Sequence, residues 1–333
     1  MSPPEGRAGA APDVSVVVAA HDVEAHLERA VTSALAQEGV RVEVVVVDDA
    51  SRDRTAVVAR RLDDADSRVT AISNATNLGP GGTRDVAIAA ATGRWVAVLD
   101  ADDAMWPGRL ARLVEVSERE RLDVIADVPV LHDLTAGRDA PKQLPADGHL
   151  QRLAVDDLLP SPERDQLDLG LLKPVFRRSL ATDGRWRYPN GVRHGEDFEL
   201  YLRLVAQGVD FGLLHEHGYV YSTRIGAVSG SWSPGTSTTV DYLGIARRCD
   251  RLAERQDNTP AVVRVLRAKA RQARRGNRVY GWTLVRRREL THARRWLRQD
   301  AENVREVGRV VLAKLRGHRG VPDWDGPRWS RGA

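Results

Sequence analysis

The sequence predicts an α/β fold, a mostly parallel sheet flanked by helices, with a basic helical extension at the C-terminal end. Three observations lead to this prediction. β-Branched runs alternate with helix-like segments four times in about the first hundred residues, as in a parallel sheet. Carboxylates follow two of these runs, where ligands bind in open α/β sheets. Arginines crowd the apolar, helix-spaced pattern of the last part of the chain.

Length and composition are those of a globular protein with a full core. The chain has 333 residues, 42% of them apolar, which suits one large domain with an extension. Its single cysteine, Cys249, excludes an intramolecular disulfide and a cysteine-rich metal site. No apolar run approaches the roughly 20 residues that span a bilayer, and the start does not resemble a signal peptide. We expect a cytoplasmic protein with a disordered start over residues 1–12.

The net charge of +4 hides an asymmetry. Residues 1–246 hold 26 Lys and Arg against 37 Asp and Glu, whereas residues 247–333 hold 24 against 9. Apolar residues at helical spacing predict two or three helices in the region 236–333. Basic helices of this kind either lie on an anionic membrane surface or pack on the body of the protein with their arginines solvated. Both alternatives stay open, and a nucleic acid partner is not expected.

Strands and helices can be assigned in order from the apolar spacing. The expected strands of the first half are residues 14–19, 42–47, 68–72 and 95–99. Residues 123–128 return as a strand, and residues 172–178 form an extended, basic segment. Trp186 and Tyr188 follow, and they either line a sugar site or pack in the core. A helix then begins near Glu196, which places Asp197 in its first turn.

The strand at 95–99 ends at Asp100, Asp102 and Asp103. Asp100 and Asp102, one residue apart, can offer oxygens to one Mg²⁺ or Mn²⁺, whose other ligands are water and substrate phosphates. The alternative is that these acids cap the next helix, which suits Asp103 best because Pro107 follows shortly after. The pattern therefore predicts a metal and phosphate site at this strand end.

A glycine-rich segment runs from Asn77 to Arg84. Its glycines let backbone amides approach an anion, the following helix presents its positive end, and Arg84 can pair with phosphate. The segment lacks the Gly-x-Gly-x-x-Gly pattern of dinucleotide-binding folds and the Lys-Ser/Thr ending of an ATPase phosphate loop. Both of these common nucleotide folds are therefore disfavoured.

Five motifs occur together in one order. They are the strand Val-Ser-Val-Val-Val-Ala-Ala-His-Asp, the segment Val47 to Thr55, the segment Asn77 to Asp85, the pair Asp100-x-Asp102, and Gly195-Glu196-Asp197. In this order they resemble GT-A fold, family 2 glycosyltransferases over residues 14–230. Lys173 to Arg178 and Tyr221-x-x-Arg224 resemble the bacterial exopolysaccharide, succinoglycan-type members.

The resemblance implies a GT-A glycosyltransferase domain over residues 13–235 and a helical C-terminal region over 236–333. It implies an inverting, metal-dependent enzyme that moves a sugar from a nucleotide-diphosphate sugar, expected to be a UDP-sugar, to a hydroxyl of a glycan or lipid-linked acceptor. The cofactor is Mg²⁺ or Mn²⁺. The enzyme is expected in the cytoplasm or at the inner face of the membrane, in cell-surface or exopolysaccharide synthesis.

Residue roles follow from the resemblance motif by motif. Asp48 and Asp49 hold the base and ribose of the nucleotide, and Asn77 and Arg84 contact the nucleotide or its diphosphate. Asp100 and Asp102 bind the ribose and the metal.

The remaining roles concern the acceptor side, the diphosphate and the edge of the nucleotide site. The resemblance implies that Asp197 is the catalytic base and that Arg224 steadies the diphosphate. Ala19 and His21 are assigned to the nucleotide-sugar site, where the family usually has Pro and Tyr.

Two other functions remain open at this point. A nucleotidyltransferase on a similar sheet would not need an acceptor-side base such as Asp197. A non-catalytic nucleotide-sugar scaffold or sensor would not need the intact acids. Asp197 itself has a plainer alternative, since acidic residues favour the first turn of a helix.

Overall fold

The computed structural model describes residues 11–133, 138–139, 146–160, 169–223, 240–286, 290–301, 303–305 and 308. These residues fall into two compact units. Unit 1 holds the described residues up to Ala154 and from Leu169 to Thr223. Unit 2 holds residues 155–160 and the described residues from Val240 onward. The predicted disordered start lies outside the described residues up to residue 10, and so does the predicted boundary at 235/236.

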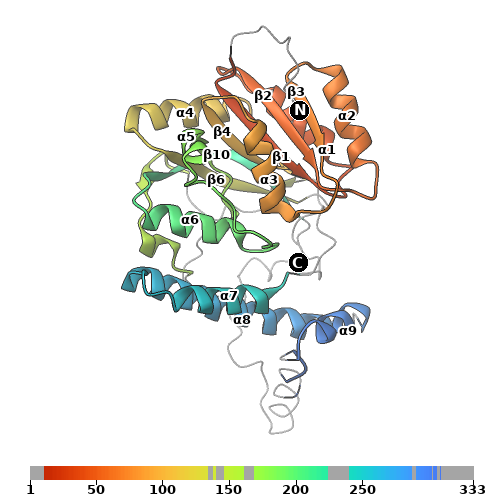
Figure 1. Ribbon diagram of the computed structural model, residues 1–333, viewed down its shortest axis with the longest axis vertical. Coiled ribbons are helices and arrows are strands. Elements are labelled where there is room, and N and C mark those ends of the chain that lie inside the picture. The colour runs from red at the N-terminus through yellow and green to blue at the C-terminus, as the bar shows by residue number, and fades with distance from the viewer. Residues whose placement is uncertain are drawn as a thin grey trace. The chain divides into compact units, whose positions relative to one another are not determined.

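Unit 1 is built on one sheet (Figure 1). The strand order is β3-β2-β1-β4-β9-β6-β10-β5, with β7 beside β6 and β8 beside β10. The strands are β1 (Val14–Ala20), β2 (Val42–Asp48), β3 (Val69–Ser73), β4 (Trp95–Asp100), β5 (Ala104–Met105), β6 (Val124–Asp133), β7 (Arg138–Asp139), β8 (Leu150–Arg152), β9 (Val175–Arg177) and β10 (Phe211–Thr223).

The first half of the sheet is parallel, as predicted. β2 pairs with β1 and β3, and β1 pairs with β4, all in the same direction. Almost every residue of β1, β2 and β4 is buried, which explains their continuous β-branched sequences. Because the strands run parallel, their carboxyl ends lie along one edge, which brings Asp48 and Asp100 to the same side of the sheet.

The short strand β9 makes the sheet mixed. It runs antiparallel to both β4 and β6 and lies between them. Val175 pairs with Ala97, and the amide of Val98 donates to the carbonyl of Pro174 at 3.0 Å. The predicted extended segment thus becomes an inner strand, and it delivers Lys173 to the carboxyl end of β4.

Helices flank the sheet of unit 1 (Figure 1). They are α1 (Leu27–Leu35), α2 (Thr55–Ala65), α3 (Gly79–Ala90), α4 (Arg109–Glu120), α5 (Ser179–Thr182) and α6 (Glu196–Ala206), with a short 3₁₀ turn η2 (Leu169–Leu171). α1 and α4 supply Leu27, Val31, Leu110 and Leu113 to a core that also contains the fully buried Trp95. Each such side chain contributes about 1.5–3 kcal/mol through burial.

One buried ion pair links α4 to β6. Arg109 Nη2 donates to Asp127 Oδ1 at 2.6 Å, and both side chains are almost fully buried. The same Nη2 donates to the carbonyl of Lys173 at 2.6 Å. Arg109 therefore neutralises the charge of Asp127 and also holds the backbone just before β9.

Unit 2 contains the 3₁₀ turn η1 (Val155–Leu158) and the helices α7 (Tyr242–Ala253), α8 (Pro260–Arg286) and α9 (Leu290–Gln299). Trp296 packs with Tyr280 and Ala293, and its indole N–H donates to Asn277 at 3.0 Å. Asn277 in turn donates to Asn303 at 2.7 Å. The predicted C-terminal helices are therefore present. In the part of the chain that the structure describes, no helix combines the length and apolar character needed to cross a bilayer.

We expect Asp127→Ala to lower the free energy of unfolding by about 3–5 kcal/mol, because it leaves the Arg109 charge buried without its partner. Chemical denaturation followed by circular dichroism measures this. The control Glu28→Gln removes one member of the exposed pair with Arg61 and should change stability by less than about 1 kcal/mol. Equal, small effects of the two substitutions on the free energy of unfolding would contradict a stabilising role for the buried pair of Arg109 and Asp127.

Candidate active site

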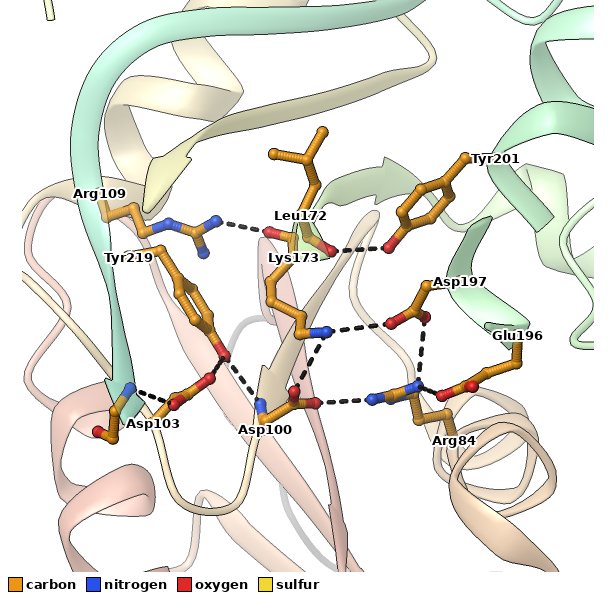
Figure 2. Close-up of polar contacts among 11 residues, drawn as sticks. Arg84, Asp100, Asp103, Arg109, Leu172, Lys173, Glu196, Asp197, Tyr201 and Tyr219 are labelled. Atoms are coloured by element: carbon orange, nitrogen blue, oxygen red, sulfur yellow. Dashed lines mark hydrogen bonds and ion pairs between the residues drawn. The ribbon is translucent and has the colours of Figure 1, made fainter. Parts of the chain in front are cut away.

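Four charged side chains form a closed ring of ion pairs at the carboxyl end of β4 (Figure 2). Arg84 comes from α3, Asp100 ends β4, Lys173 precedes β9, and Asp197 lies in the first turn of α6. Positive and negative groups alternate around the ring. Segments more than a hundred residues apart in the sequence thus meet at one point.

Arg84 makes three of the contacts in this cluster. Its Nη2 donates to Asp100 Oδ1 at 2.7 Å, and its Nη1 donates to Asp197 Oδ1 at 3.3 Å and to Glu196 Oε1 at 3.2 Å. The guanidinium also lies over the ring of Tyr188, 5.4 Å from its centroid. The side chain is buried, with 5% of Arg84 exposed. The structure therefore brings together the predicted site residues Arg84, Asp100 and Asp197.

Lys173 completes the ring. Its Nζ lies 3.0 Å from Asp197 Oδ2 and 3.1 Å from Asp100 Oδ2, and only 5% of the residue is exposed. Its backbone is fixed on both sides. Arg109 donates to the carbonyl of Lys173, and the hydroxyl of Tyr201 donates to the carbonyl of Leu172 at 2.8 Å (Figure 2). Sequence reasoning did not select Lys173, because only its pairing beside β4 brings it to the acids.

The charges of the cluster perturb one another. Burial opposes ionisation of Asp100, but the charges of Lys173 and Arg84 outweigh it and lower its pKa to about 2. Burial also disfavours the charged form of Lys173, but Asp100 and Asp197 reverse this and raise its pKa. Burial and the charge of Asp197 raise the pKa of Glu196 to about 7. Glu196 is thus the member of the cluster that changes its charge near neutral pH.

The loop after β4 is held by β10. Asp103 accepts hydrogen bonds from the Tyr219 hydroxyl and from the amide of Ser222, both at 2.7 Å. Tyr219 also accepts from the amide of Asp100 at 3.1 Å, and Arg29 donates to the carbonyl of Asp102 at 2.8 Å. The interpretation of Asp103 as a helix cap is wrong, since α4 begins only at Arg109 and the Asp103 carboxylate binds β10 instead.

A second cluster lies at the carboxyl end of β2. The Asp49 carboxylate accepts from the amides of Leu78 and Gly79 at 2.8 and 2.9 Å. Asn77 Nδ2 donates to the carbonyl of Asp49 at 3.2 Å, and His21 Nδ1 lies 2.9 Å from the same carbonyl. The predicted nucleotide residues Asp49, Asn77 and His21 are therefore neighbours.

The glycine-rich segment differs from the expected anion loop. α3 already begins at Gly79, so its glycines lie in the helix. The first amides at that end are occupied by Asp49 and are not directed at an open site. The reason for Gly79 is local, because its φ of 78° is a left-handed conformation that favours glycine.

Two buried acceptor atoms near this segment have no hydrogen-bond partner among the described residues. They are Oδ1 of Asp48, which ends β2, and Oδ1 of Asn77. Buried polar atoms are normally satisfied, so each of these oxygens is suited to a donor group of a ligand. Ala19, also assigned to the nucleotide-sugar site, lies in β1 opposite Asp100 and Val47.

The remaining predicted residues have mixed outcomes. Trp186 and Tyr188 are both 2% exposed, and Trp186 stacks on Phe176 with ring centroids 3.6 Å apart. Packing is therefore their role, and they do not line an open sugar site. Arg224 lies outside the described residues, directly after β10.

The carboxylates of Asp100 and Asp102 fit a hard divalent cation in their chemistry. Both are acids at the end of β4, and Asp100 is held ionised. Each oxygen of Asp100 is already paired with Arg84 or Lys173. A cation bound at Asp100 must compete with these two side chains.

Comparison with known proteins identifies the family. Residues 15–170 match the model of glycosyl transferase family 2. Succinoglycan biosynthesis protein ExoO of Rhizobium meliloti (strain 1021) is 37% identical over 221 residues, which are 66% of this chain and 63% of ExoO. ExoU of the same organism is 35% identical over 240 residues, covering 67% of this chain and 66% of ExoU. The chain thus spans slightly less than two thirds of either relative. It belongs to glycosyltransferase family 2.

Solved structures support the fold. The structure of S. aureus TarS 1-349 aligns with a TM-score of 0.57 at 17% identity, covering 94% of this chain and 95% of TarS 1-349. The same TarS segment in complex with UDP-GlcNAc also gives a TM-score of 0.57, over 82% of this chain and 71% of that chain. The predicted α/β fold, with a mostly parallel sheet flanked by helices, is confirmed as GT-A-like.

The raised pKa of Glu196 predicts a pH dependence of stability. The native state binds this proton more tightly than the unfolded state, so its contribution is complete below about pH 4.5 and is lost as pH rises through about 7. We expect Glu196→Gln to gain about 1–3 kcal/mol in unfolding free energy relative to the wild type when the pH is changed from 5 to 8. Denaturant titrations at the two pH values test this. A constant difference between the two proteins would contradict it.

Proposed function

We propose that this protein transfers a sugar, with inversion, from a nucleotide-diphosphate sugar to a hydroxyl group of a glycan or lipid-linked acceptor. One observation carries the proposal. In a family 2 chain, the predicted base Asp197 and the predicted metal-site residue Asp100 share the same two cations, Arg84 and Lys173. A base on the acceptor side and an anion site on the donor side, joined in this way, suit group transfer between two bound substrates.

The donor is proposed to be a UDP-sugar. The orphaned oxygens of Asp48 and Asn77 offer acceptors for donor groups of a base or ribose. Asp49 is proposed to act indirectly, by holding the segment that carries Asn77, because its own carboxylate is occupied by backbone amides. His21, with 41% of its side chain exposed, is proposed to border the base. The UDP-GlcNAc bound in TarS is consistent with uridine at this edge of the fold.

Mg²⁺ or Mn²⁺ is proposed at Asp100 and Asp102. When bound, the ion offsets the negative charge that develops on the leaving diphosphate. Arg84 and Lys173 are proposed to add fixed positive charge on the same side of the reacting carbon. Arg224 keeps its predicted role of steadying the diphosphate.

The chemical step is proposed to centre on Asp197. Its carboxylate takes the proton of the acceptor hydroxyl as the hydroxyl oxygen attacks the anomeric carbon. The bond from that carbon to the diphosphate oxygen breaks, and the electron pair leaves with the nucleoside diphosphate. Attack opposite the leaving group inverts the configuration. A positioned base of this kind typically contributes about 10²–10⁴-fold in rate.

The biological setting is proposed by similarity. ExoO and ExoU are named for succinoglycan biosynthesis, and polysaccharide synthesis is accordingly proposed for this protein. The predicted domain, residues 13–235, is proposed to hold the whole transfer site. The region 236–333 is proposed as the part that meets either the catalytic body or an anionic membrane surface.

Asp197→Asn should lower sugar transfer by about 10²–10⁴-fold while nucleotide binding is retained, because the substitution removes the base and keeps its shape. Transfer is measured as the incorporation of labelled sugar into the glycan and lipid fractions of membranes from a polysaccharide-producing strain. The control Glu199→Gln removes a negative charge two residues further along α6 and keeps all four residues of the ring. Undiminished transfer by Asp197→Asn would exclude the base role.

Asp102→Asn should abolish the dependence of nucleotide binding on metal. The wild type is expected to bind UDP at least about tenfold more tightly with Mn²⁺ than with EDTA, since an ion held by Asp102 would offset the negative charge of the diphosphate. In the variant the two affinities should converge on the weaker value. Calorimetric titration measures both. A variant that keeps the full metal effect would show that Asp102 is not the ligand.

A further inference from the structure

The ring raises a chemical difficulty for the proposed base. Both carboxylate oxygens of Asp197 are held by cations, Oδ1 by Arg84 at 3.3 Å and Oδ2 by Lys173 at 3.0 Å. A carboxylate in two such contacts has less electron density available for the proton of an acceptor hydroxyl. As the structure stands, the base is therefore masked.

The same two cations are the strongest anion-binding groups of the site. Lys173 and Arg84 also hold both oxygens of Asp100, so all four bonds of the ring compete with any incoming anion. The donor of the proposed reaction carries a diphosphate, which would contact the cations at this end of β4. A diphosphate carries more negative charge than a carboxylate, so it would compete with Asp100 and Asp197 for the ammonium and guanidinium groups.

Lys173 is the more easily redirected of the two cations. Its backbone is fixed through the carbonyls of Leu172 and Lys173, so the ammonium group can move only about its flexible four-carbon stem. Figure 2 shows this stem extending from the anchored backbone to the point between Asp100 and Asp197. Arg84, in contrast, is held by three carboxylates and lies against Tyr188.

We propose that Lys173 is a positioning residue that keeps Asp197 masked until the diphosphate of the donor draws the ammonium group away. The inference rests on the proposed function. It makes donor binding a condition for acceptor activation, so that the base becomes available only when a sugar is in place. It also assigns a specific role to a lysine for which the sequence pattern alone indicated none.

The test is a double-mutant cycle of anion binding in the full-length protein, which needs no acceptor. UDP and inorganic pyrophosphate, each with Mn²⁺, are titrated calorimetrically into the wild type, Asp197→Asn, Lys173→Met and the double variant. Asp197→Asn removes the competing carboxylate and should lower the Kd about tenfold relative to the wild type. In the wild type, only the fraction of molecules whose Lys173 is free of Asp197 can bind, and this fraction reduces the apparent affinity. Lys173→Met should weaken binding, and the double variant should show no gain over Lys173→Met.

Two controls isolate the contact from general charge effects. Glu199→Gln removes one negative charge from the same turn of α6 and should leave the Kd unchanged. Lys173→Arg keeps the cation and should preserve the gain that Asp197→Asn produces. Lys173→Met removes a buried, paired group, so thermal melting must first establish that this variant folds. If it does not fold, Lys173→Arg replaces it in the double-mutant cycle.

The outcomes separate this inference from the proposed function. If Asp197→Asn binds UDP and pyrophosphate no more tightly than the wild type, masking by Lys173 is overturned, while loss of transfer in the same variant leaves the function intact. If Asp197→Asn also lowers the Kd in the Lys173→Met background, the gain comes from removing a negative charge in general. The masking role of Lys173 is then overturned as well. If the wild type binds neither probe, the proposed function fails, and the inference with it.

Discussion

The ion-pair ring of Arg84, Asp100, Lys173 and Asp197 is the interaction on which the rest of unit 1 depends. Placing four buried charges together costs desolvation energy, and alternation of sign with short contacts is the arrangement that offsets this cost. Each member comes from a different element: α3, β4, the segment before β9, and α6. The fold must therefore bring four separated pieces of chain into register before the charges can pair.

The supporting structure is arranged to secure that register. β9 lies antiparallel between β4 and β6, and the buried pair of Arg109 and Asp127 fixes its leading end. Asp103 ties the loop after β4 to β10 through Tyr219 and Ser222. These contacts are buried and hold the functional groups in place, which a site for group transfer requires.

Much of this arrangement follows from the sequence, and the exceptions have physical causes. The strands β1 to β4 were predictable because a parallel sheet buried on both faces demands continuous β-branched runs, and the acids at its edge followed from that geometry. The segment Lys173 to Arg178 stood out as a family resemblance, but the place of Lys173 in the site was not predictable, because only the fold shows that the antiparallel β9 brings it to the acids. The role of Asp49 was also obscured, since only the fold shows its carboxylate bonded to the amides that begin α3. Trp186 and Tyr188 had two interpretations, which burial resolved in favour of packing.

We expect this edge of the sheet to bind a nucleoside diphosphate with the help of a divalent cation. The most direct measurement is calorimetric titration of UDP, GDP, TDP and CDP into the wild-type protein, once with Mn²⁺ and once with EDTA. UDP should bind tightly with Mn²⁺ and far more weakly with EDTA, and the other nucleotides should bind less well in both conditions. Absence of binding by all four nucleotides in the presence of Mn²⁺ would contradict it.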